Sequence, residues 1–326
     1  MDKLIPQRVL LFDFLRVVGI SMILFSHVLI TMGPSWIEID QFTIGFKSSY
    51  YWTGWGEIGV TIFLIVSGLS LEFTYGGRKI NFASYYLRRI VRIYPIYYMS
   101  LLLGLSIYIA FVWWGHFRYG KPFALLPDFG FEDFLLTLSG FNAFAGKWGG
   151  PLVWSSWFIG LLMVLYVLYP GISYGIQKFE WNTLIFLFLL SLGSRFLIEK
   201  TDILPGNPKE WFPLSRIFEF GLGIFLATVP GREFLLSLNR FLGSIPFLAF
   251  LGTLSFPLFL IHDPLRRFIV FGSPDVSSLA VGIFVFLLVS VFISYVVLVI
   301  DRKIQTSLKS RYQIVLSFGK LEKSGK

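Results

Sequence analysis

Cysteine is absent from the 326-residue chain, and only three histidines are present, widely spaced along it. The chain therefore has no disulfide, no thiolate nucleophile and no cysteine-bound metal, and a histidine-rich metal site is not expected. Charge is also scarce. Asp, Glu, Lys and Arg make up 14% of the residues, against roughly 25% in soluble domains. The deficit extends along the whole chain, which excludes an ordinary soluble domain.

Long apolar runs account for the mean hydropathy of +0.71, and they recur from end to end. Two stretches, about 123–145 and 264–273, are too short or too interrupted to assign as spans. The sequence therefore predicts an all-α fold, a polytopic transmembrane helical bundle with eight to ten spans, surrounded by the lipid bilayer. The eight clear spans are expected at about residues 10–32, 58–75, 91–114, 155–177, 183–198, 214–230, 243–262 and 278–300.

The distribution of basic residues predicts the orientation of these spans. The net charge is +9, but no nucleic acid partner is expected, because Lys and Arg collect on the cytoplasmic face of membrane proteins. If the N-terminus is cytoplasmic and eight spans alternate, most Lys and Arg lie inside. Both termini are therefore predicted to be cytoplasmic in a multi-pass protein of the cell membrane. Residues 301–326 are expected to form a basic cytoplasmic tail, helical at the interface or partly disordered.

The first span carries three side chains that hydrocarbon disfavours: Asp13, Arg16 and His27. Arg16 and His27 are eleven residues apart, which places them on nearly the same helix face and about 16 Å apart along the axis. Asp13 lies one turn from Arg16 and can pair with it. That pair could be purely structural, but His27 lies too deep to reach the interface. We expect His27 to be functional and this polar stripe to face the bundle interior or a wet cavity.

A second basic cluster, formed by Arg88, Arg89 and Arg92, lies at the cytoplasmic end of the third span. Arg88 and Arg92 are four residues apart and share a helix face. One interpretation is the basic signal that orients the span. The other is a phosphate clamp, because guanidinium groups bind phosphate bidentately. Charge alone does not separate the two.

Residues near the outer ends of later spans are candidate contacts of a polar substrate. His262 is expected at the outer interface, where a histidine is more often structural than catalytic. Arg195, Arg216 and Glu219 are expected within or beside spans, either lining an outward-facing cavity or pairing with one another. Trp157 opens the fourth span, among tryptophans whose positions are typical of an aromatic belt.

Five short motifs follow one another along the chain. Their residues are Asp13, Arg16 and His27; Gly59, Val60, Phe63, Ser67 and Gly68; Arg89, Arg92, Ile93 and Pro95; Trp157, Phe158, Tyr166 or Tyr169, and Pro170; and Leu251, Gly252, Ser255, Phe256, Pro257, Phe259, Leu260, Ile261 and His262. In these motifs and their order, the chain resembles the acyltransferase-3 family of integral membrane O-acyltransferases over about residues 8–300. Each motif alone is weak, but five in this order are specific. One branch of the family has a glutamate where this chain has Leu162, so a role borrowed from that glutamate does not transfer.

The resemblance implies transfer of an acyl group, commonly acetyl, from cytoplasmic acyl-CoA (acetyl-CoA) to a hydroxyl of a cell-surface or lipid-linked glycan, without a metal. It implies a membrane acyltransferase domain over residues 1–300. His27 would act as general base or be transiently acylated itself, and Arg16 would hold the donor or stabilise developing charge. The implied site residues are His27, Arg16 and Asp13 for catalysis; Arg88, Arg89 and Arg92 for CoA phosphate; and Trp157, Arg195, Arg216, Glu219 and His262 for substrate.

Three other classes of protein compete with this interpretation. A transporter or flippase of glycan or lipid could use Arg16 and His27 as a coupling site, although the chain lacks an inverted repeat. A non-catalytic scaffold or sensor would not explain a deep histidine on the same face as an arginine. A membrane O-acyltransferase of the unrelated MBOAT type would use a late buried histidine, and only His262, expected at the interface, is available. The sequence specifies neither the acceptor nor the oligomeric state.

Overall fold

The computed structural model describes residues 9–32, 49–121, 129–147, 152–201, 208–228, 235–239, 245–270 and 276–321, together with residues 150, 204 and 233. The regular structure in these residues is entirely helical, which confirms the expected all-α fold. The helices are α1 (Leu10–Met32), α2 (Ser49–Tyr75), α3 (Phe82–Tyr119), α4 (Phe131–Ser139), α5 (Trp157–Phe179), α6 (Trp181–Thr201), α7 (Pro208–Trp211), α8 (Pro213–Leu226), α10 (Pro246–Val270) and α11 (Val276–Leu321), with 3₁₀ turns η3 (Asn142–Ala145) and η4 (Trp154–Ser156).

Within the described ranges, seven helices are long and apolar enough to cross a membrane: α1, α2, α3, α5, α6, α10 and α11. Each coincides with one of the expected spans. Two of them are much longer than expected, with 38 residues in α3 and 46 in α11. At 1.5 Å per residue these helices are about 57 and 69 Å long, whereas the hydrocarbon core is about 30 Å thick. Both therefore extend beyond the membrane core, and most of the expected basic tail continues α11 as helix.

The eighth expected span, 214–230, falls on the short helix α8, which has 14 residues. A helix of that length measures about 21 Å. It packs against α2, α5 and α6, and most of its side chains are buried. Protein rather than lipid surrounds α8, so it does not need the length of a complete membrane span.

The two uncertain stretches have different outcomes. Residues 264–270 continue α10, which runs without interruption past Pro257 and Pro264 to Val270. In the stretch 123–145, residues 131–145 include only α4 and η3, which are too short to cross a membrane. Residues 123–128 and 271–273 lie outside the described residues.

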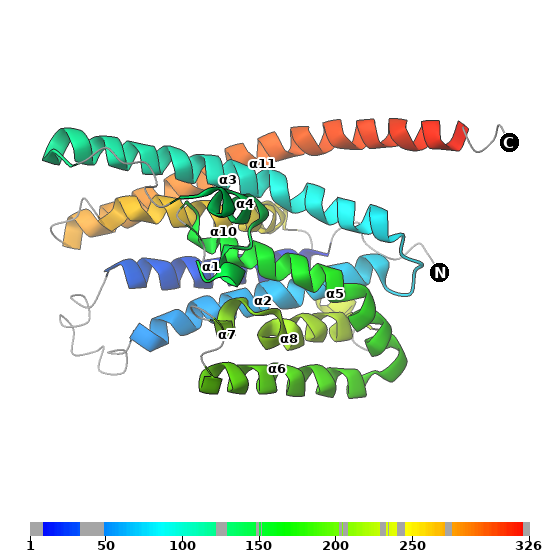
Figure 1. The fold of residues 1–326 in the computed structure, drawn as a ribbon. Helices are drawn as coiled ribbons and strands as arrows, with labels where there is room; N and C mark the ends of the chain where they lie inside the picture. The colour runs from blue at the N-terminus through cyan, green and yellow to red at the C-terminus, as the bar shows by residue number, and fades with distance from the viewer. Residues whose placement is uncertain are drawn as a thin grey trace.

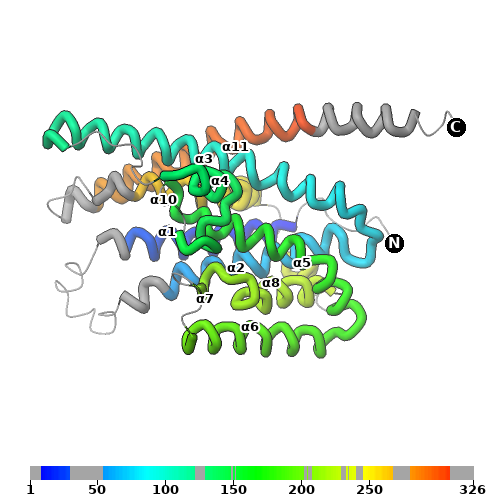
Figure 2. Tube along the Cα trace, viewed as in Figure 1, coloured from blue at the N-terminus to red at the C-terminus, as the bar shows by residue number. Residues whose placement is uncertain are grey.

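The long helices lie side by side along a common direction (Figure 1). The first residues of α1 and the last residues of α11 lie at the same end of the bundle, on the right in Figure 1, which we call the terminal end. Figure 2 traces α1 between α2 and α10, and α1 makes extensive contacts with both. The helix nearest the N-terminus thus packs directly on a helix from the last quarter of the chain.

Glycines allow α2 and α8 to approach closely. A Cβ on Gly68 would overlap the carbonyl oxygen of Phe220, and a Cβ on Gly223 would overlap the carbonyl oxygen of Ile65. Only glycine fits at such backbone contacts, and small residues serve the same purpose in membrane helix pairs. This supports packing as the role of the small residues in the second span.

Candidate active site

Two histidines from opposite ends of the chain meet inside the bundle. His27 on α1 and His262 on α10 are joined by a hydrogen bond between His27 Nδ1 and His262 Nε2, 2.7 Å long. Their ring centroids are 4.9 Å apart. His262 is completely buried between helices, whereas its expected place at the outer interface stays a prediction. The packing of α10 on α1 places the His262 ring beside His27.

A backbone carbonyl sets the direction of this hydrogen bond. His262 Nδ1 lies 3.0 Å from the carbonyl oxygen of Leu258, and a carbonyl oxygen can only accept, so Nδ1 carries the proton. In a neutral imidazole the other nitrogen is then an acceptor, and His27 Nδ1 must donate to His262 Nε2. His27 Nε2 is left with a free lone pair. The pair is therefore arranged so that His27 can take up a proton at Nε2.

Three aromatic rings form an apolar wall beside the histidines. Phe63 on α2, Phe158 on α5 and Phe259 on α10 contact one another, with ring centroids 5.0–6.4 Å apart. Phe259 also contacts the ring of His262. All three phenylalanines are buried. Such a wall lowers the local polarity and excludes water from one side of the pair.

A buried carboxylate follows His262 directly in sequence. Asp263 is 2% exposed and accepts two hydrogen bonds, from the backbone N–H of Trp154 (2.6 Å) and from Nε of Arg266 (3.1 Å). The negative charge of Asp263 also acts on both histidines. Arg266 opposes a positive charge on the histidine pair, and Asp263 offsets part of that effect.

The other end of the polar stripe on α1 is an ion pair, as expected from spacing. Arg16 Nη1 lies 3.2 Å from Asp13 Oδ1, and the Asp13 side chain is almost fully buried. The second guanidinium nitrogen of Arg16 donates to the hydroxyl of Ser70 on α2 (3.0 Å). The charge of Arg92 on α3 also acts on Arg16. Arg16 is thereby held toward the interior, where α1, α2 and α3 converge.

The three arginines of α3 have different surroundings. Arg88 and Arg92 are exposed. The Arg89 guanidinium lies 5.7–5.9 Å from the ring centroids of Tyr75, Tyr85 and Tyr166, which surround it as an aromatic cage. Its Nε is buried and has no hydrogen-bond partner among the described residues. Tyr166 also interacts with the charge of Arg16, so Arg16 and Arg89 approach the same tyrosine from α1 and α3.

Arg195, Arg216 and Glu219, which were expected near the outer ends of spans, pair with one another, which was one of the two expected outcomes. Arg195 Nη2 and Arg216 Nη1 lie 2.8 and 3.4 Å from Glu219 Oε1. Arg195 Nε also donates to the carbonyl oxygen of Ser215. This network joins α6 to α8.

Glu210 on α7 lies beside this network and outside the membrane-spanning helices. Burial and the nearby charge of Glu57 raise the pKa of Glu210 to about 7, against the opposing effect of Arg216. The backbone carbonyl of Glu210 accepts a hydrogen bond from Arg216 Nε (3.3 Å). This polar cluster therefore contains a carboxyl group whose pKa is raised to about 7.

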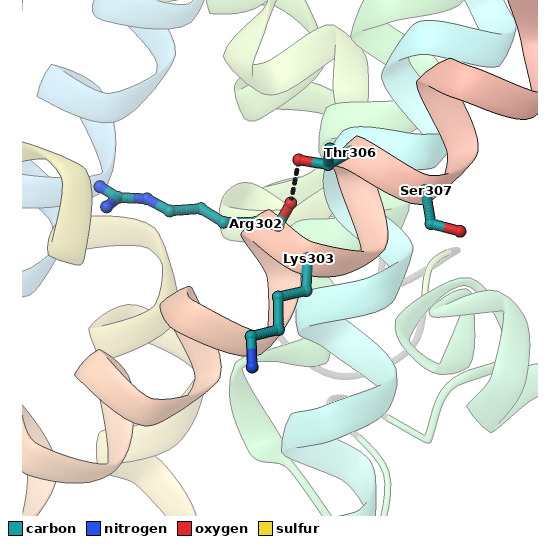
Figure 3. Close-up of a pocket in the computed structure, with 4 residues that line it drawn as sticks. All are labelled: Arg302, Lys303, Thr306 and Ser307. Atoms are coloured by element: carbon teal, nitrogen blue, oxygen red, sulfur yellow. Dashed lines mark hydrogen bonds between the residues drawn. The ribbon is translucent and has the colours of Figure 1, made fainter.

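Two further features lie apart from the histidine pair. Trp157, expected to contact substrate, is buried against Phe158. A hollow of about 460 Å³ lies beside the terminal-end half of α11 and is lined by Arg302, Lys303, Thr306 and Ser307 (Figure 3). Figure 3 shows the Arg302 and Lys303 side chains pointing in different directions, so they do not converge on one ligand. No cluster of metal-ligating side chains occurs in the described parts of the chain.

Sequence reasoning missed several members of the site. The partner of His27 is a residue 235 positions away, and no helical periodicity connects them. The adjacency of His262 and Asp263 was a usable signal, since ionisable residues within membrane segments are rare and often functional. The Tyr75–Tyr85–Tyr166 cage around Arg89 comes from three helices and has no local sequence signature.

The buried polar residues and the long apolar helices define a multi-pass membrane protein with a candidate catalytic centre between helices. Residues 10–235 match the family model described as an acyltransferase domain, Acyl_transf_3. The match covers most of the chain, which therefore belongs to the acyltransferase-3 family of membrane acyltransferases. No curated protein and no solved structure matches it. The matched range includes His27 and the three arginines of α3 but ends before α10.

Proposed function

We propose that this protein transfers an acetyl group from cytoplasmic acetyl-CoA to a hydroxyl of a cell-surface or lipid-linked glycan at the cell membrane. The observation that supports this most directly is the hydrogen bond between His27 and His262. It leaves His27 Nε2 free to accept a proton in a site walled by phenylalanine rings. General bases of this kind work best when the imidazole is neutral before the reaction.

The chemical step starts when the acceptor hydroxyl gives its proton to His27 Nε2. The hydroxyl oxygen attacks the thioester carbonyl, the carbon–sulfur bond breaks, and the ester forms. The CoA thiolate leaves and takes the proton back from His27, which restores the neutral pair. While His27 is protonated, its Nδ1 proton can shift across the 2.7 Å contact to His262, so the two rings share the charge close to Asp263.

The arginines near the terminal end are proposed to bind the donor. Arg16 and Arg89 approach Tyr166 from two helices, and Arg92 acts on Arg16. Asp13 pairs with Arg16. Arg89 and Arg92 leave the region with positive charge that CoA phosphates can neutralise. Arg88 is exposed on the same helix face as Arg92 and can assist from the surface.

The polar stripe on α1 connects the two parts of the proposed site. Arg16 and His27 lie about 16 Å apart along the helix axis. Donor phosphates bound near Arg16 would therefore lie about that far from the base, toward the terminal end of the bundle. The long pantetheine arm of CoA would extend between the helices and present the thioester to His27. The acceptor would approach from the opposite end of the bundle. The donor would then enter from the cytoplasmic side and the acceptor from the other side of the membrane.

The proposal is tested with purified protein in lipid nanodiscs, acetyl-CoA and a glycan acceptor, with CoA release followed by a thiol reagent. The chain contains no cysteine, so every thiol detected comes from CoA. The change His27→Ala should lower acetyl transfer by about 10²–10⁴-fold, the usual contribution of a general base.

The same preparation separates this proposal from the transporter alternative. A flippase would move its glycan or lipid without releasing CoA, whereas an acyltransferase releases one CoA for each ester formed. Near-normal transfer by a folded His27→Ala variant would remove His27 from the mechanism. No CoA release by the wild-type protein with any acceptor would overturn the proposed function itself.

A further inference from the structure

A tryptophan and an arginine form an open pair at the outer side of the histidines. The Arg266 guanidinium lies 5.6 Å from the ring centroid of Trp154. The Trp154 side chain lies at the surface, with 46% of the residue exposed, whereas Arg266 is mostly buried. The guanidinium covers part of the ring, and the remainder of the ring is accessible.

The buried carboxylate of Asp263 holds both members of this pair. One oxygen accepts from the backbone N–H of Trp154 (2.6 Å), and the other accepts from Arg266 Nε (3.1 Å). Charge-assisted hydrogen bonds of this length fix the positions of the groups that donate them. These bonds place the Trp154 backbone and the Arg266 guanidinium before any ligand arrives, which reduces the entropy lost on binding.

Helix α10 carries both Arg266 and the proposed base partner, whereas Trp154 lies on η4. Asp263 follows His262 directly, and Arg266 lies one helical turn further on. His262 in turn contacts His27. A ligand placed on Trp154 therefore lies next to the histidine pair, on the side from which the acceptor is proposed to approach.

We propose that Trp154 and Arg266 form the acceptor subsite and that this subsite binds the ring of an uncharged sugar; the assignment rests on the function proposed above. The face of an indole ring is electron-rich and suits the weakly positive C–H groups on one face of a pyranose. Arg266 uses Nε for Asp263, so its remaining N–H groups can donate to sugar hydroxyls. Because Asp263 neutralises Arg266, this pair of side chains does not favour an anionic ligand.

An aromatic belt alone would explain an exposed tryptophan but not its fixed partner. Trp114 on α3 has a similar exposure, 55%, and serves as the matched control. A residue that only anchors the protein in the membrane needs neither a buried carboxylate nor an oriented guanidinium. The difference between Trp154 and Trp114 is what the experiment measures.

The test uses the full-length protein in nanodiscs and three probes: the p-nitrophenyl glycosides of glucose, N-acetylglucosamine and glucuronic acid. Binding is measured by saturation-transfer NMR, which does not require turnover. The variants are Trp154→Phe, Trp154→Ala and the control Trp114→Ala. The contact to Asp263 comes from the backbone N–H of residue 154, so both substitutions at this position preserve it.

We expect the wild-type protein to bind at least one of the two uncharged probes and to bind the glucuronide more weakly. Trp154→Ala should weaken sugar binding by about 5- to 10-fold, as expected for loss of an aromatic contact. Trp154→Phe should have a smaller effect and Trp114→Ala none. In the CoA-release assay, Trp154→Ala should raise the acceptor KM and leave the acetyl-CoA KM unchanged.

Three results would overturn the subsite: no binding of any probe, equal losses in Trp154→Ala and Trp114→Ala, or tighter binding of the glucuronide. The failure of the proposed function has a different signature. A wild-type protein that binds the sugar through Trp154 but never releases CoA would retain the subsite and lose the acyltransferase mechanism.

Discussion

Gly252 on α10 lies directly against Asp13 on α1: a Cβ at position 252 would be 2.7 Å from the Cα of Asp13. This contact brings the two helices together about three turns from His262 along α10 and about four turns from His27 along α1. A side chain at position 252 would therefore separate α1 from α10 and lengthen the distance between the histidines.

We predict that Gly252→Ala lowers both stability and activity. Overpacking of this kind costs about 1–3 kcal/mol, and loss of the His27–His262 contact should reduce acyl transfer further. Thermal unfolding of the detergent-purified protein and the CoA-release assay measure the two effects. Gly171→Ala on α5 is the control, because a Cβ at that position meets no atom within 4 Å among the described residues. Equal behaviour of the two variants would contradict the proposed role of the Gly252 contact.

The second prediction concerns the partner of the base. His262→Leu removes the acceptor for His27 Nδ1, so nothing selects the tautomer with a free Nε2, and activity should fall by about 10²-fold or more. His262→Gln places an amide oxygen that can accept from His27 and should retain more activity. Both variants should keep the wild-type KM for acetyl-CoA. An active His262→Leu variant would show that the tautomer does not depend on His262.

The third prediction separates phosphate binding from membrane orientation at Arg92. Lys cannot reproduce a bidentate contact, so Arg92→Lys should weaken acetyl-CoA binding and Arg92→Ala should weaken it more. The loss should shrink with 3′-dephospho-CoA if that phosphate is the partner. Isothermal titration measures these affinities. If Arg92 only orients the span, Arg92→Lys binds like the wild type, since both residues satisfy the positive-inside rule.

The fourth prediction concerns topology. Both termini are expected to be cytoplasmic, and so is the segment from Arg78 to Arg92. Because the chain has no native cysteine, a single Cys introduced in place of Lys320 reports only its own position. This Cys should react with an impermeant maleimide after the cells are opened but not before. Labelling in intact cells would reverse the orientation.

The fifth prediction concerns Glu210, whose pKa is raised to about 7. The folded protein therefore binds this proton more tightly than the unfolded chain, whose glutamates titrate near 4.5. The stabilisation from the protonated form is complete below about pH 4.5 and is lost as the pH rises through about 7. Glu210→Gln should remove this part of the pH dependence.

The measurement is the Tm of wild type, Glu210→Gln and Glu199→Gln between pH 5 and 8. Glu199 is a surface control, with its side chain 64% exposed. The Tm of the wild type should fall more steeply with pH than that of Glu210→Gln, and Glu199→Gln should behave like the wild type. Parallel curves for the wild type and Glu210→Gln would mean that burial does not shift this group.

The local contacts of the site were predictable, and the long-range ones were not. Helical spacing alone predicted that Asp13 pairs with Arg16, because partners three residues apart face each other. The same reasoning placed Arg88 and Arg92 on one face. It could not show that the Arg89 side chain lies among three tyrosine rings. His262 was expected at the interface because its depth depends on the packing of α10. Hydropathy found α8 but overestimated its length, since a helix enclosed by protein has the same composition as one that crosses lipid.

The 235 residues between His27 and His262 also have a consequence for biosynthesis. At roughly 5–20 residues per second, His27 enters the membrane about 12–47 seconds before His262 is synthesised. Throughout that interval nothing in α10 can fix the tautomer of His27. A partly made chain thus contains the base and the arginines of α3 but lacks the group that makes the base effective. In the proposed mechanism, acyl transfer therefore begins only after α10 has been inserted and His262 can contact His27.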